Sequence, residues 1–146
     1  MHTIEWLIEN RVLYSRVWGE QTMEMVKLSN VQLKEMLDQG TAPIHLIMDT
    51  REMTAMPRSL SQLQDSMQAT KHPSLGWVVT VGTTNPITKY MGMMIAKLFR
   101  LRFRRVESFS DTLTFIQTID PTVDLSLAKP DVVNAANVLN TASVGK

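Results

Sequence analysis

The sequence contains no cysteine among its 146 residues. This absence excludes disulfide bonds, thiolate catalysis and cysteine-based zinc sites. No apolar run approaches the roughly 18 residues that a membrane-spanning helix needs, and the N-terminus lacks the basic and apolar segments of a signal peptide. We therefore expect a cytoplasmic protein without a membrane span.

Catalytic and cofactor-binding signatures are also missing. There is no GxSxG turn, no glycine-rich dinucleotide turn and no Walker spacing. His2, His45 and His72 are too far apart in the sequence to form a standard metal motif. His45 falls in a predicted buried strand, so we expect a satisfied core or sheet-face residue. We predict no cofactor and no metal, and we assign no catalytic residue; nothing in the sequence argues for an enzyme.

The charges are nearly balanced, because 15 Lys and Arg stand against 14 Asp and Glu. A net charge of +1 gives no general attraction to nucleic acid or to a membrane. A third of the positive residues nevertheless lie in the segment 97–105, namely Lys97, Arg100, Arg102, Arg104 and Arg105. A phosphate or nucleic-acid partner would have to bind this basic segment rather than the whole surface.

Hydrophobic periodicity predicts alternating strands and helices. A hairpin is expected first, with Asn10 taking a positive φ in its turn. The elements expected, in chain order, are strands over 4–8 and 12–19, a helix over 22–39 stopped by a left-handed Gly40, a strand over 44–49, a helix from Ser59 to His72, a strand over 77–82, a helix over 87–98, a strand from Phe99, and a helix capped by Ser110 and Asp111 and ended by Asp120.

This order predicts an α/β fold in one domain. We expect a mixed sheet of about five strands, with the N-terminal hairpin followed by parallel strands, and about four packed helices. The domain would span residues 1–121. The tail 122–146 has little periodicity and is expected to be loosely attached, either partly disordered or forming one short helix.

Four segments of this pattern occur together: the opening hairpin, the buried strand ending in Asp49, the run HPSLGWVV over 72–79, and LFRLRFR over 98–104. They resemble the STAS-type fold of bacterial anti-sigma-factor antagonists, in the SpoIIAA-like (STAS/SEC14-like) branch. The resemblance implies a regulatory or binding module that acts through a protein partner or a small apolar ligand. Antagonists of this kind carry a phosphorylatable serine in an Asp-Ser-Ser-Gly-like turn. Residues 49–59 have neither the serine pair nor the glycine, so we carry over no phosphoacceptor.

Two strand ends offer candidate ligand-binding residues. Asp49 is expected at the carboxyl end of a buried strand, where open α/β sheets place ligands; alternatively it caps the next loop or pairs with Arg51. Thr83, Thr84 and Lys89 follow the next strand and could hold a phosphate or carboxylate at a helix start. A simple N-cap explains the same threonines. Both alternatives stay open.

The basic segment also has two interpretations. Phe99, Leu101 and Phe103 alternate with arginines, which is typical of a strand with one face on the core. A helix continuing to Arg105 is the alternative boundary, because no glycine or proline separates helix from strand. We expect a sheet strand first, with phosphate or nucleic-acid binding through 97–105 as the alternative function.

The helix before the basic segment carries an apolar stripe that is expected to pack on the sheet. Its members are Ile87, Tyr90, Met91, Met94, Ile95 and Leu98. A symmetric homodimer through a helix or a sheet edge is compatible with a domain of this size.

Overall fold

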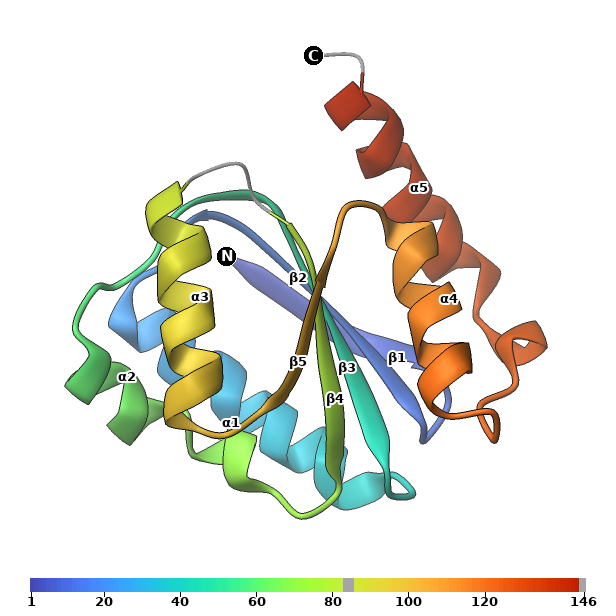
Figure 1. Ribbon diagram of the computed structural model, residues 1–146, viewed down its shortest axis with the longest axis horizontal. Helices are drawn as coiled ribbons and strands as arrows, with labels where there is room; N and C mark the ends of the chain where they lie inside the picture. The colour runs from blue at the N-terminus through green and yellow to red at the C-terminus, as the bar shows by residue number, and fades with distance from the viewer. Residues whose placement is uncertain (83–85, 145–146) are drawn as a thin grey trace.

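The computed structural model describes residues 1–82 and 86–144 and contains a five-stranded sheet with the strand order β1-β2-β3-β4-β5 (Figure 1). β1 (His2–Ile8) runs antiparallel to β2 (Val12–Glu20). β3 (Ile44–Ala55), β4 (Leu75–Val81) and β5 (Arg102–Val106) are parallel to β2 and to each other. The predicted mixed sheet, a hairpin followed by parallel strands, is confirmed.

Helices cover both faces of the sheet. α1 (Met23–Gln39), α2 (Leu60–Ser66) and α3 (Pro86–Leu98) lie on one face, whereas α4 (Phe109–Ile119) and α5 (Pro130–Val144) lie on the other (Figure 1). The first three helices share a face because each connects neighbouring parallel strands in the same direction, and such crossovers are right-handed. Short 3₁₀ helices occur at Gln68–Lys71 and Leu125–Leu127.

Successive strand residues point to opposite faces and so build two cores. Ile47 and Val79 pack with the buried residues of α4 and α5. Their neighbours Leu46 and Val78 pack on the α1 side of the sheet. All four side chains are buried, and burying each contributes about 1.5–3 kcal/mol. The strands therefore have apolar residues on both faces, as their nearly continuous apolar sequences predict.

Several local signals in the sequence are confirmed. The Thr22 hydroxyl accepts the Met25 N–H at 3.2 Å and caps α1. The Ser59 hydroxyl accepts the Gln62 N–H at 3.4 Å and caps α2. Asn10 has a φ of 66° in the hairpin turn, as expected for a residue that tolerates this region.

Gly40 follows α1 as predicted, but its predicted left-handed conformation is wrong. Its φ is −92°, which any residue can adopt. The reason for glycine is space, because a Cβ here would lie 2.6 Å from Ile44 Cδ1 and 2.9 Å from the Asn10 carbonyl oxygen. The missing side chain lets the hairpin turn and the start of β3 approach the end of α1.

Three predicted boundaries are also wrong. β3 continues past Asp49 to Ala55, because its polar second half pairs with the end of β2, for example Glu52 with Trp18. α2 ends at Ser66 rather than at His72, and a 3₁₀ turn fills the interval. α4 begins earlier than predicted, because the Ser108 hydroxyl accepts the Asp111 N–H at 3.2 Å and is the actual cap.

The junction between α3 and β5 has no glycine, yet it has the hydrogen bonds that usually accompany a glycine at the C-terminal end of a helix. The N–H of Leu101 donates to the Ala96 carbonyl at 2.9 Å, and the N–H of Arg100 donates to the Lys97 carbonyl at 3.2 Å. This is a Schellman motif, with Arg100 in the left-handed position at φ 54°. The helix therefore ends at Leu98, and the strand begins at Arg102 rather than at the predicted Phe99.

The segment after residue 121 contributes to the core on the α4 side of the sheet. Val123, Val132 and Ala136 are buried in that cluster, and the N–H of Lys129 donates to the Leu7 carbonyl at 2.8 Å. The part of the segment from Val123 to Ala136 is therefore packed, not loosely attached as its composition suggested, because α5 presents small and branched apolar residues to the sheet. The domain boundary at residue 121 stays a prediction.

Candidate functional site

α3 does not lie flat on the sheet. Met91 and Ile95 are buried, as predicted for the inner stripe, but they pack against Leu63 of α2 and not on the sheet as expected. Ile87, Tyr90 and Leu98 belong to the same predicted stripe but are exposed, so the prediction is wrong for these three. The helix uses only a narrow apolar face for its contact with α2.

A cavity of about 390 Å³ lies between the sheet and the helices α1, α2 and α3. Its wall is mainly aliphatic, aromatic and thioether: strands contribute Leu46, Val78 and Phe103, and α1 contributes Val26 and Leu33. Five of the 11 methionines also line it, namely Met48, Met53, Met56, Met67 and Met93. Because methionine is flexible and polarisable, this wall can adapt to apolar ligands of different shape.

The polar groups of the cavity wall are a minority and come from both strands and helices. Ser15 and Thr50 are buried, and the Thr50 hydroxyl donates to the Val81 carbonyl at 2.8 Å. A mostly apolar wall with a few placed polar groups is typical of small-molecule sites, which have volumes of about 300–1,000 Å³. The cavity therefore has the size and composition of a small ligand site.

One end of the cavity is positively charged. Lys89 and Arg105 line it, and no acidic side chain does so among the described lining residues. Both lie where β4 passes into α3, since Arg105 pairs with Thr80 near the end of β4 and Lys89 belongs to the first turn of α3. The Arg105 guanidinium lies directly against Gly82, where a Cβ would overlap it. Glycine at this position thus makes room for the arginine head group.

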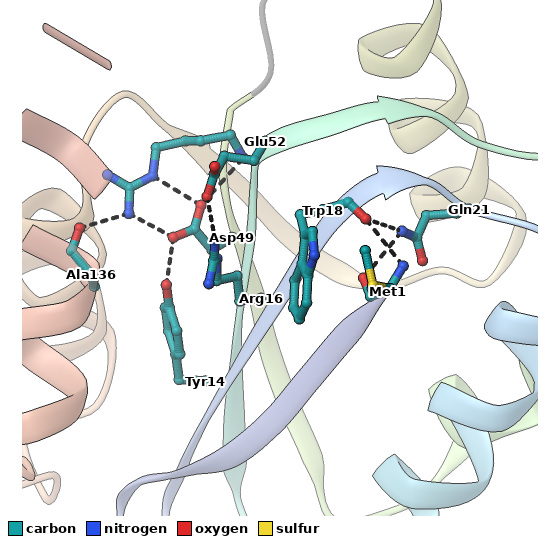
Figure 2. A network of polar contacts seen from close by, with 9 residues as sticks. Met1, Tyr14, Arg16, Trp18, Gln21, Asp49, Glu52 and Ala136 are labelled. Atoms are coloured by element: carbon teal, nitrogen blue, oxygen red, sulfur yellow. Dashed lines mark hydrogen bonds and ion pairs between the residues drawn. The ribbon is translucent and has the colours of Figure 1, made fainter. Parts of the chain in front are cut away.

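Asp49 lies on the opposite face of the sheet, within a buried polar network (Figure 2). Its carboxylate is 1% exposed and accepts hydrogen bonds from the Tyr14 hydroxyl at 2.5 Å and from Arg51 Nε at 2.9 Å and Nη2 at 2.6 Å. Arg51 Nη2 also donates to the Ala136 carbonyl of α5 at 2.9 Å. Burial and the adjacent Asp49 charge raise the pKa of Tyr14 well above its usual value. The pairing with Arg51 that the sequence offered as an alternative is the arrangement in the structure.

The ligand-binding candidates from the sequence do not lie together in the structure. Thr83 and Thr84 lie outside the described residues. Lys89 lines the cavity, whereas Asp49 faces α4 and α5, so the sheet separates these two candidates. They do not form one site.

The basic segment is divided among three locations. Lys97 is exposed in the last turn of α3, and Arg100 is exposed in the turn that follows. Arg102 and Arg104 are exposed on the α4 face of β5, where the Arg104 guanidinium lies 5.4 Å from the Phe115 ring centre. Arg105 points to the cavity face of the same strand. The five cations do not share one exposed face, which the nucleic-acid hypothesis required.

His45 joins a second polar cluster near the C-terminal end of α4. Its Nδ1 accepts the Trp77 N–H at 3.0 Å, so its proton is on Nε2, which donates to Asp120 Oδ2 at 2.8 Å. Arg11 Nη2 bonds the same carboxylate at 2.9 Å. Gly76 makes room for this ring, because a Cβ there would lie 2.7 Å from His45 Nδ1. The predicted core role of His45 agrees with this geometry.

The described part of the chain has neither a cluster of metal ligands nor a helix suited to span a membrane. Residues 1–82 and 86–144 contain no group of three or more His, Asp or Glu side chains that could hold a metal ion. No helix within these ranges combines the length and apolarity needed to cross a bilayer.

Sequence reasoning missed the cavity and the cationic end that Arg105 helps to form. Periodicity shows which face of an element is apolar but not whether facing elements touch, so a space between α3 and the sheet leaves no sequence signal. Arg105 did have one signal. It is two residues after Phe103, and side chains at that spacing share a strand face.

No protein-family model matches the sequence, and no curated protein sequence matches it. Solved structures do match. An uncharacterised DUF3478-family protein with a SpoIIAA-like fold from Shewanella loihica PV-4 has a TM-score of 0.57 at 15% identity, covering 79% of this chain and 91% of that chain. The anti-sigma factor antagonist SpoIIAA in its unphosphorylated form has a TM-score of 0.53 at 11% identity, covering 80% and 98%.

The Bacillus cell fate determinant SpoIIAA in its phosphorylated form has a TM-score of 0.50 at 12% identity, with 80% of this chain and 99% of that chain covered. Identities this low establish a fold and not a shared function. The element order, the sheet topology and these comparisons agree: the chain has a SpoIIAA-like, STAS-type fold.

Proposed function

We propose that this chain is a non-enzymatic binding module of the STAS type that takes a small apolar ligand into the cavity between the sheet and α1, α2 and α3. The observation that carries the proposal is the cavity itself, about 390 Å³ in volume and lined mainly by apolar side chains. A protein interior is normally packed with few voids larger than a water molecule. A space of this size therefore indicates a binding site.

Gly92 provides a direct test. It lies in α3 and lines the cavity, and a Cβ built on it meets no atom within 4 Å. Gly92→Leu should fill part of the space without a clash and should remove a helix-weakening glycine, so the variant should melt no lower than the wild type. We expect saturable binding of the neutral dye Nile red to the wild type and its loss in Gly92→Leu.

The matched control is Tyr90→Leu, on the exposed side of the same helix. It should bind Nile red like the wild type. Absence of saturable binding to the wild type, or equal binding by Gly92→Leu, would contradict the proposal. So would turnover in a hydrolase or phosphatase panel that is lost in Asp49→Asn.

A regulatory protein partner is the second candidate function. It is supported by the exposed apolar side chains of α3, Ile87, Tyr90 and Leu98, and by the solved SpoIIAA that is described as an anti-sigma factor antagonist. Affinity capture with the wild type and with Tyr90→Lys tests it. A protein captured by the wild type and lost in the variant would support the candidate, whereas identical capture by both would count against it.

A further inference from the structure

We infer that the occupant of this cavity is a single-chain amphiphile with an anionic head group, held with its head at Lys89 and Arg105 and its chain along the apolar wall. The inference rests on the proposed function and names the chemical class of its ligand. It follows from the distribution of charge in the cavity, from the seating of Arg105 and from the cavity volume.

The charge of the cavity wall is complementary to an anion. The two charged side chains among the described lining residues are both cationic, and they occupy the same end of the cavity. The rest of the wall offers aliphatic and thioether groups with a few hydroxyls and amides. Cations beside an apolar space are poorly solvated, so an anion that enters there gains stronger attraction than it would in water. A neutral apolar ligand would gain no such attraction at this end of the cavity.

The position of the Arg105 side chain also suits an anionic head group. Its guanidinium rests on Gly82, so the missing side chain at the end of β4 determines where the charged group lies. Nη1 bonds Glu107 Oε1 at 3.1 Å, but that carboxylate is 82% exposed, and such surface pairs contribute little. A carboxylate or phosphate head group could replace Glu107 at modest expense, and the guanidinium fork suits the planar oxygens of both.

The size of the cavity limits the apolar part of the ligand. The apolar part of the wall extends from the cationic end to Val26 and Leu33 of α1 and to Leu46 near the start of β3. The volume of about 390 Å³ is near the lower end of the usual range for ligand sites. One alkyl chain suits such a space better than the two chains of a phospholipid.

Three compounds with the same chain test the inference: dodecanoate, dodecyl phosphate and dodecanol, each measured by displacement of Nile red below its micelle concentration. We expect one or both anions to bind the wild type about 10-fold or more tightly than the alcohol, because hydrogen bonds to charged groups are strong. The stronger of the two anions identifies carboxylate or phosphate as the head group.

Variants locate the head group. Arg105→Gln and Lys89→Gln should weaken anion binding about 10-fold and leave dodecanol binding unchanged. Gly82→Ala should have the same effect by displacing the guanidinium while both cations are retained. Arg102→Gln is the control, because it removes the same charge from the opposite, exposed face of β5. Melting curves establish which variants are folded. Weaker anion binding by any one folded variant among Arg105→Gln, Lys89→Gln and Gly82→Ala is enough to locate the head group.

The outcomes separate this inference from the proposed function. Equal affinities for the anions and the alcohol, or losses in Arg102→Gln as large as those in Arg105→Gln, would overturn the inference while the apolar site stands. Failure of the wild type to bind Nile red or any of the three compounds would overturn both. Anion binding that is tighter than alcohol binding, and that is lost in either Arg105→Gln or Gly82→Ala, would support both the inference and the proposed function.

Discussion

At the residue scale, a buried polar network around Asp49 connects the sheet with α5. Asp49, Tyr14 and Arg51 join β2 and β3, and Arg51 extends the network to the backbone of α5 (Figure 2). A buried ion pair adds little stability over an apolar pair, but removing one partner leaves an uncompensated charge. Asp49 is therefore expected to be important for folding even if it contacts no ligand.

Asp49→Ala should lower the free energy of unfolding by about 3–5 kcal/mol, because it leaves the Arg51 guanidinium, 5% exposed, without its carboxylate. Urea denaturation followed by circular dichroism measures this change. The matched control is Glu52→Ala, which breaks the more exposed pair with Arg16 and should cost less than about 1 kcal/mol. Similar losses in the two variants would contradict the assignment.

His45 makes stability depend on pH. Burial lowers its pKa, as do the charges of Arg11 and Arg102, and these together outweigh the opposing effect of Asp120. The folded protein therefore keeps this imidazole neutral, while the unfolded chain binds a proton below about pH 6.5. The unfolding free energy should fall as the pH falls below that value, because the unfolded state binds more protons.

Denaturation between pH 7.5 and about pH 5 measures this slope, and His45→Gln, which cannot titrate, should reduce it. The lowered pKa of Asp120 does not affect the slope measured in this pH range. Burial raises that pKa, but hydrogen bonds from Thr122 and His45 outweigh it, so the carboxylate contributes only near and below pH 3.8. If the slope is unchanged in His45→Gln, a group other than His45 causes the pH dependence.

At the element scale, the α3–β5 junction shows where local signals succeed and fail. The starts of α1 and α2 were predictable because Thr22 and Ser59 use the standard cap chemistry. The end of α3 was not, because Arg100 occupies a left-handed position at which glycine is the usual signal. The extension of β3 was also hidden, since it depends on pairing with β2 rather than on its own polar sequence.

Arg100→Gly should raise the unfolding free energy by about 1 kcal/mol, because glycine adopts the left-handed region without the Cβ penalty. Thermal melting tests this. Arg104→Gly, within β5, should instead lower the melting temperature, because a glycine in a strand interior weakens it. A lower melting temperature for Arg100→Gly would show that contacts of the arginine side chain outweigh backbone strain.

At the scale of the whole molecule, the fold and the site differ in how far the sequence predicts them. The α/β class, the hairpin and the parallel strands follow from periodicity and connection rules. Lys89 was a candidate on sequence grounds and does line the cavity, but Asp49 lies behind the sheet. The site depends on the distance between α3 and the sheet, which no local pattern records.

The split of the basic segment argues against nucleic-acid binding. We expect no measurable binding of a fluorescent duplex or single-stranded oligonucleotide at low salt, because the five cations occupy separate surfaces and the net charge is only +1. Fluorescence anisotropy tests this. Binding that weakens steeply with salt and is lost in Arg102→Gln and Arg104→Gln would favour the alternative function.

The central claim is that the cavity is a ligand site, and native mass spectrometry of the intact 16.6 kDa chain, mixed in turn with dodecanoate, dodecyl phosphate and dodecanol, tests it most directly. We predict one bound molecule of at least one of these compounds on the wild type and none on Gly92→Leu. A wild-type chain that stays at its bare mass with all three compounds, or equal adducts on both proteins, would contradict the claim.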